Sequence, residues 1–142
     1  MIPKTKAEAS RNSETSRAPF TAAAVGSHWR FEDLEIWKLA RDLAVKFHGL
    51  AAKLEQRKLY RYAEQLRSAG LSMPNNIAEG SGSLHAGEFR QFLNIARRST
   101  FENASMLLVF EAMNVLARDE VVSLLDDCDR LSRMITNYSR TR

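Results

Sequence analysis

Residues 65–80 read QLRSAGLSMPNNIAEG, and this stretch decides the fold. Small and apolar residues recur in it at intervals of three and four, which places them on one face of a helix: Gly70, Met73, Ile77 and Gly80. Pro74 lies inside this helix, has no N–H to donate, and crowds the carbonyl of Gly70 with its ring. We therefore predict a helix that is kinked at Gly70 and Pro74 and packs closely in the middle of a bundle.

Apolar residues at the same spacing predict three further helices. The expected helices, in order, cover about residues 34–54, 60–80, 85–116 and 119–138. Asp33 and Asp119 are the expected N-caps of the first and fourth helices, because short polar side chains can accept the free N–H groups there. No stretch alternates as a strand would. Four amphipathic helices with short connections predict an all-α, antiparallel up-down-up-down four-helix bundle.

The chain divides into two regions. Residues 1–28 are rich in Ala, Ser, Thr, Lys and Arg, contain Pro3 and Pro19, and show little periodicity, so we predict a flexible N-terminal tail. Residues 29–142 hold the four helices and form the single expected domain, which suits a chain of 142 residues.

Composition sets broad limits on function. The net charge of +4 permits a nucleic-acid partner but does not require one. A single cysteine, Cys128, excludes a disulfide within this sequence and any CxxC redox or zinc site. No apolar run approaches the ~20 residues of a membrane span, so we expect no membrane partner and a cytoplasmic location.

Three segments carry a resemblance to a known family: FEDLEIWKLA (31–40), YAEQLRSAGLSMPNNIAEGSG (62–82) and FRQFLNIARRSTFENAS (89–105). Together they resemble the bacterial four-helix-bundle family of 23S rRNA intervening-sequence proteins, whose relatives include the accessory variability determinant of diversity-generating retroelements. The matching positions are Trp37, Ala40, Gln65, Leu66, Arg67, Ser72, Asn76, Ile77, Ala78, Glu79, Gly80, Phe92, Leu93, Ile95, Ala96, Ser99 and Glu102. Three positions depart from the family pattern: Gly70 replaces Ala, Met73 replaces Ile, and Arg98 replaces Gly.

The resemblance implies assembly more than activity. Such proteins are non-enzymatic helical bundles that form ring-like homopentamers, and some are encoded within rRNA intervening sequences. The retroelement relatives bind nucleic acid and a reverse transcriptase through a basic surface. On this basis we expect no enzymatic activity and a homo-oligomer, specifically a pentamer.

The third predicted helix has an apolar surplus that also favours an oligomer. Its second half reads MLLVFEAMNVL (106–116) and is apolar almost all round. A helix at the edge of a monomeric bundle needs only one apolar face, so the surplus indicates a second buried surface. The residues expected at this subunit interface are Met106, Leu108, Val109 and Met113.

The sequence contains no convincing catalytic or metal-binding constellation. It has no Glu-x-x-His pair of the kind that di-iron bundles use, and no P-loop or dinucleotide-binding fingerprint. Cys128 lies on the apolar seam of the fourth helix and is interpreted as a small core residue. We therefore predict no cofactor and no metal.

Polar residues on the second and third helices are open to two interpretations. The favoured one is a hydrogen-bonded polar layer that fixes helix register, formed by Asn76, Glu79, Ser99 and Glu102, with Asn103 as a further candidate. The alternative is a ligand or metal pocket between Glu79 and Glu102. Two carboxylates without a histidine make a poor transition-metal site, which counts against that alternative.

Basic residues on the same two helices give the sharper functional hypothesis. The expected nucleic-acid-binding residues are Arg57, Lys58, Arg61, Arg67, Arg90, Arg97 and Arg98, and Tyr60 or Tyr62 could stack on an unpaired base. Two alternatives remain open. The arginines could form a solvated face paired with the acids of the fourth helix, or the ring could be a protein–protein scaffold that ignores nucleic acid.

Overall fold

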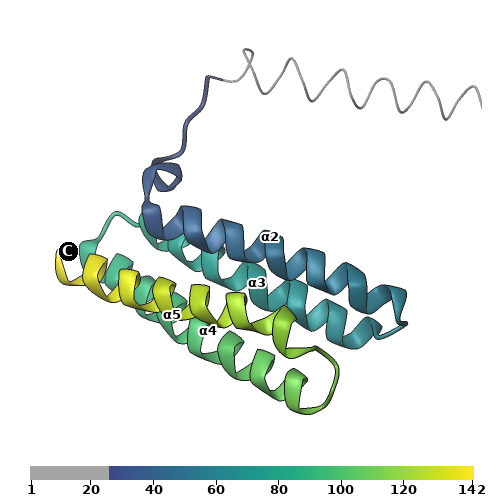
Figure 1. Ribbon diagram of the computed structural model, residues 1–142. Coiled ribbons are helices and arrows are strands. Elements are labelled where there is room, and N and C mark those ends of the chain that lie inside the picture. The colour runs from purple at the N-terminus through teal and green to yellow at the C-terminus, as the bar shows by residue number, and fades with distance from the viewer. Residues whose placement is uncertain (1–25) are drawn as a thin grey trace, which may run out of the picture.

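The computed structural model describes residues 26–142 as a bundle of four long helices (Figure 1). A short 3-10 turn, η2, precedes them. The elements are η2 Arg30–Asp33, α2 Glu35–Gln56, α3 Tyr60–Ser81, α4 Ala86–Ala112 and α5 Arg118–Arg140. No strand occurs between residues 26 and 142. The all-α four-helix bundle predicted from the sequence is confirmed, whereas most of the tail predicted over residues 1–28 lies outside the described residues.

Each helix packs against the next one in the chain, and α5 closes the ring of contacts on α2. The contact pairs also give the relative directions of the helices. On α3, Ala69 lies beside Asn103 of α4, and Gly80 lies beside Phe92. Residue numbers therefore increase along α3 in the direction in which they decrease along α4, so the two helices are antiparallel. Figure 1 shows the chain reversing its direction at each connection between helices.

The core is the layer where the four apolar faces meet. Its largest fully buried side chains come from every helix, and they include Phe47, Leu66, Met73, Leu107 and Ile135. Burial of such side chains is the main term that stabilises a bundle of this size.

Two glycines of α3 lie where neighbouring backbones approach most closely. A Cβ on Gly70 would lie 2.9 Å from the Cβ of Phe47 on α2, and a Cβ on Gly80 would lie 2.5 Å from the Cβ of Phe92 on α4. Helix α3 is thus in close contact with both of its neighbours, α2 and α4. It continues past the buried Pro74 without interruption, and the kink expected there stays a prediction.

Several helix ends differ from those predicted. Leu34 and Ala117 are the N-cap residues of α2 and α5, so the predictions of Asp33 and Asp119 were wrong. The carboxylate of Asp33 instead contacts the His28 ring at 2.9 Å, and the N–H of Ala117 donates to Glu120 at 2.8 Å. At α5 the capping bond therefore involves Glu120 rather than Asp119, and at α2 the Asp33 carboxylate is engaged by His28.

Helix α4 ends at Ala112, four residues before the predicted end. Asn114 has φ of 62°, the left-handed conformation that commonly terminates a helix. The next two residues, Val115 and Leu116, lie in the loop but are buried in the core. Their apolar side chains therefore extend the apolar pattern beyond the end of the helix. Periodicity alone therefore overstated the length of this helix.

Candidate nucleic-acid interface

The seven basic residues predicted to bind nucleic acid do not form one surface. Arg57, Lys58 and Arg61 lie at the turn between α2 and α3. Arg98 lies on α4 next to Ser99, which contacts Ser72 of α3. Arg61 and Ser72 are eleven residues apart on one helix, which corresponds to roughly 16 Å along the bundle. The predicted set therefore splits into separate groups.

Two residues of the group at the α2–α3 turn, Arg57 and Lys58, have structural roles. The guanidinium of Arg57 donates to the carbonyl of Val115 at 2.6 Å and so ties this turn to the turn between α4 and α5. Lys58 has φ of 63° and closes the turn in the left-handed conformation. Tyr62 packs edge-on against Phe110 with ring centroids 5.1 Å apart, so this ring is not free to stack on a base.

Arg67 is neutralised by a carboxylate. Its guanidinium donates two hydrogen bonds to Glu55, at 2.7 and 2.8 Å. These bonds lower the pKa of Glu55 below its ordinary value and raise the pKa of Arg67. Within residues 26–142, this is the one ion pair that involves any of the seven predicted residues, and the acid belongs to α2. The alternative in which these arginines pair with acids of the fourth helix therefore has no such ion pair among residues 26–142.

Arg97 is held between α4 and α5. Its Nε donates to the hydroxyl of Thr136 at 2.7 Å, and that hydroxyl donates in turn to the carbonyl of Ser132 at 3.0 Å. The guanidinium carbon also lies 4.9 Å from the centre of the Phe101 ring. A half-buried arginine with two such restraints keeps its terminal amino groups in a defined position.

Arg97 lines a hollow of about 340 Å³ in the groove between α4 and α5. The lining residues are Leu93, Asn94, Arg97, Ile135, Thr136, Ser139 and Arg140, and none of them is acidic. We call this part of the groove the arginine section. Arg90, two turns before Arg97 on the same helix, donates to the carbonyl of Arg142 at 3.1 Å and so lies at the nearby end of the bundle.

Sequence reasoning missed Arg140 as a site residue. Cations near the C-terminus of a helix interact favourably with its dipole, and that role was sufficient to account for Arg140. The available signal was the expected antiparallel packing of α4 and α5, which brings the end of α5 beside the start of α4. That packing places Arg140 opposite Asn94, one turn from Arg97.

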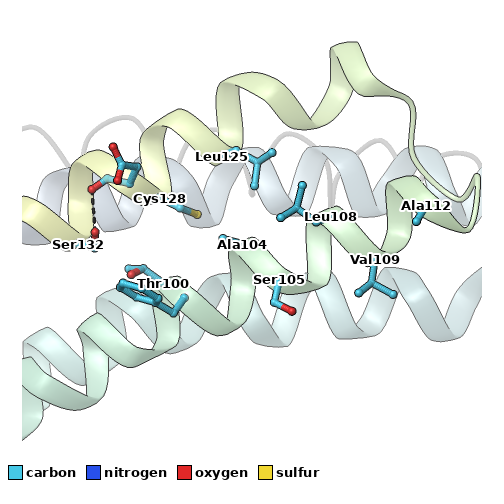
Figure 2. A pocket seen from close by; sticks show the side chains of 11 residues that line it. Thr100, Ala104, Ser105, Leu108, Val109, Ala112, Leu125, Cys128 and Ser132 are labelled. Atoms are coloured by element: carbon cyan, nitrogen blue, oxygen red, sulfur yellow. Dashed lines mark hydrogen bonds between the residues drawn. The ribbon is translucent and has the colours of Figure 1, made fainter.

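The groove continues past Phe101 as an apolar section. Figure 2 shows this part between α4 and α5, with a volume of about 480 Å³. It is lined by Thr100, Phe101, Ala104, Ser105, Leu108, Val109, Ala112, Leu125, Cys128, Asp129 and Ser132. The Phe101 side chain is 58% exposed at the junction of the two sections. A cationic hollow therefore adjoins an apolar one.

The residues predicted for a subunit interface lie on the outer surface of α4. Leu108, Val109 and Met113 are 47%, 48% and 47% exposed, while Met106 is half-buried. The bundle therefore leaves apolar side chains of α4 uncovered, as the sequence predicted. Coverage of this surface by another copy stays a prediction.

The polar layer between α3 and α4 differs in composition from the predicted one. Ser99 is buried and its hydroxyl bonds that of Ser72, while Asn103 is buried and donates to the carbonyl of Ala69 at 2.9 Å. Asn76 donates to the carbonyl of Ser72 within its own helix at 2.7 Å. Serine and asparagine side chains thus form the layer.

Glu79 and Glu102 are exposed, which corrects their predicted place in the buried layer. The physical reason is that a buried carboxylate requires compensating partners, whereas both of these side chains are exposed to water. Glu102 lines a shallow hollow of about 330 Å³ with Arg98 and Asn76, and Glu79 does not belong to that lining. The two carboxylates therefore do not share a pocket.

Within residues 26–142, no three His, Cys, Asp or Glu side chains gather closely enough to hold a metal ion. Cys128 is buried, and its burial, together with the charge of Asp127, raises the pKa of the thiol to about 12. No helix in the described part of the chain combines the length and apolar character that a membrane crossing requires.

Comparison with known proteins identifies the family. The model of the family described as 23S rRNA-intervening sequence protein matches residues 32–137, which include most of all four helices. The chain belongs to this family. No curated protein matches it. The family match extends over Arg97 and the whole apolar section, whereas Arg140 lies three residues beyond its end.

Proposed function

We propose that this member of the 23S rRNA-intervening sequence protein family is a non-enzymatic homo-oligomer that binds RNA through the arginine section of the α4–α5 groove. One observation carries the proposal: Arg97 and Arg140 line the same hollow, and no carboxylate lines it with them. The family's name supports RNA as the nucleic acid.

The chemistry of the arginine section suits a phosphate. A guanidinium presents several N–H donors in a planar fork that matches phosphate oxygens. Thr136 occupies only the Nε of Arg97, which leaves the terminal amino groups for a ligand. Because Thr136 and Phe101 already restrain this side chain, little conformational entropy remains to be lost on binding.

Exposed apolar residues support self-association. They occur on two sides of α4, since Phe101 and Leu108 line the groove with α5 while Ile95 lines the hollow with α3. Two different apolar surfaces on one subunit suit head-to-tail contacts, which close into rings. The resemblance implies that the ring is a pentamer.

Oligomerisation also strengthens the RNA-binding argument. Two arginines bind phosphate weakly in water, because surface charges are screened by salt. Copies of the arginine section on one ring would contact one RNA simultaneously, and the effective concentration of the later contacts raises the overall affinity. A weak site on one subunit thus becomes a useful site on the assembly.

The RNA-binding proposal is tested by titrating a labelled RNA at two salt concentrations. The double variant Arg97→Gln with Arg140→Ala is expected to lose at least about tenfold in affinity, and the slope of log K against log salt is expected to fall by about 1.4 to 1.8 for two lost phosphate contacts. Arg118→Ala is the matched control, because Arg118 is exposed and already paired with Glu111 at 2.7 Å.

Absence of binding at low salt, or an equal loss in the Arg118 control, would refute the proposal and favour the protein–protein scaffold. Self-association is tested separately by sedimentation at working concentration. A single subunit of 16.1 kDa would refute the ring.

A further inference from the structure

The α4–α5 groove has two chemically different sections that share one junction. On α4, Arg97 of the arginine section and Phe101 of the apolar section are one turn apart, with the guanidinium 4.9 Å from the ring centre. On α5, Thr136 and Ser132 are likewise one turn apart and belong to the two sections in the same order. The change from cationic to apolar lining therefore occurs within one helical turn.

A nucleotide has the same division, with an anionic phosphate on one side of the sugar and a flat, largely apolar base on the other. From this match we infer that the junction takes one unpaired nucleotide, with its phosphate at Arg97 and Arg140 and its base stacked on Phe101. The inference deepens the proposed RNA binding and rests on it. It specifies the form of the RNA, because a paired base is already stacked within its helix and cannot offer its face to a protein ring.

The exposure of Phe101 supports this role. The side chain is 58% exposed, whereas Phe110 of the same helix is buried in the core. Arg97 covers one region of the ring, and the exposed remainder is available for stacking. Stacking of bases on aromatic side chains next to cations is the usual way in which proteins bind single strands.

Electrostatics at the junction are also compatible with a phosphate. Asp129 is the one carboxylate in the lining of the apolar section, and its oxygen lies 2.6 Å from the guanidinium of Arg133. Its charge is therefore compensated within α5. The Ser132 hydroxyl donates to the backbone carbonyl of Asp129 at 2.8 Å, which is the dashed contact in Figure 2.

The nucleotide needs only the Phe101 end of the apolar section. That section has a volume of about 480 Å³ and extends along α4 as far as Ala112. Its far end, around Leu108 and Leu125, remains available for contact with a neighbouring subunit. Base stacking and ring formation are therefore compatible in one groove.

The experiment compares a labelled single-stranded RNA with a hairpin duplex of equal length by fluorescence anisotropy at low salt. Wild-type protein is expected to prefer the single strand by about tenfold or more. Phe101→Leu keeps an apolar side chain but removes the ring, and it is expected to weaken single-strand binding by about five- to hundredfold. Duplex binding is expected to weaken much less, because Thr136 still holds the Nε of Arg97. Phe101→Tyr keeps the ring and is expected to retain the wild-type preference.

Other outcomes separate this inference from the proposal on which it rests. If Phe101→Leu affects both RNAs equally or not at all, while Arg140→Ala weakens both, phosphate binding stands and base stacking is refuted. If neither RNA binds the wild-type protein, both ideas are refuted. If Phe101→Leu dissociates the oligomer and abolishes both affinities together, the ring of Phe101 is a subunit contact, and the inference is likewise overturned.

Discussion

Replacing Gly70 by alanine tests whether α2 and α3 touch through their backbones. The new Cβ would lie 2.9 Å from the Cβ of Phe47 and 3.3 Å from the Cα of Ala44. Relaxed carbon–carbon contacts are about 3.5–4.0 Å, so the methyl group is roughly half an ångström too close. Both neighbouring atoms are fixed to the backbone of α2, so the overlap cannot be relieved by a rotamer change. Overpacking of this kind costs about 1–3 kcal/mol.

Alanine also has a higher helix propensity than glycine, by about 0.8–1.0 kcal/mol, and this gain must be separated from the overlap. Gly49 is the matched control because it is exposed in α2 and has no atom within 4 Å of its would-be Cβ. Gly49→Ala is expected to stabilise the fold by about 0.5–1 kcal/mol. Since both variants share the propensity gain, their difference of about 1–3 kcal/mol isolates the helix–helix overlap.

The measurement is urea unfolding followed by circular dichroism. All variants are compared at one protomer concentration, because self-association makes apparent stability depend on concentration. Gly70→Leu adds further atoms at the same contact and is expected to cost at least as much as Gly70→Ala. If Gly70→Ala is as stable as Gly49→Ala, the close approach of α2 and α3 at this point is refuted.

Three further predictions concern single side chains. The lowered pKa of Glu55 means that its pair with Arg67 stabilises the fold above the usual range of the carboxyl, and that this contribution is lost as pH falls through the lowered value. Glu55→Gln is thus expected to be less stable than wild type at neutral pH and equal to it in strong acid, and equal urea midpoints at both would contradict this. Burial raises the pKa of Cys128 to about 12, so a thiol reagent at mildly alkaline pH should label the native protein only as fast as it unfolds. Rapid labelling would show that the thiol is accessible. Asn103→Leu removes a buried Oδ1 that has no partner among the described residues, and it also removes the hydrogen bond from Nδ2 to the carbonyl of Ala69. Because the first change relieves a desolvation cost and the second loses a bond, the free energy of unfolding is expected to change by less than about 1 kcal/mol, and a loss above about 2 kcal/mol would refute this.

The number and type of helices could be predicted from the sequence because apolar residues repeat with the helical period on every one of them. The helix ends could not. Asp33 and Asp119 have side chains that suit an N-cap, yet the N-cap residues of α2 and α5 are Leu34 and Ala117. The final turn of α4 depends on Asn114 adopting positive φ, a backbone choice that apolar periodicity does not report.

The candidate site was harder to predict because it depends on contacts between helices. Arg67 and Arg97 look alike in sequence, since each lies in an amphipathic helix beside small residues. The structure separates them. Arg67 is paired with Glu55 of α2, while Arg97 contacts Thr136 of α5 and forms no ion pair with a carboxylate of residues 26–142. Sequence spacing predicts which residues share one face of a helix. Whether an arginine on that face is paired with a carboxylate depends on which neighbouring helix packs against it.

The two close contacts of α3 have a consequence for how this chain can vary in length. Gly70 fits against α2 and Gly80 fits against α4, and the two glycines are ten positions apart, which corresponds to about 15 Å of helix. One inserted residue would turn the second glycine by about 100° and bring a side chain against Phe92. Insertions should therefore be tolerated at the turns between helices, whereas the number of residues between Gly70 and Gly80 cannot change without disrupting the packing of α3.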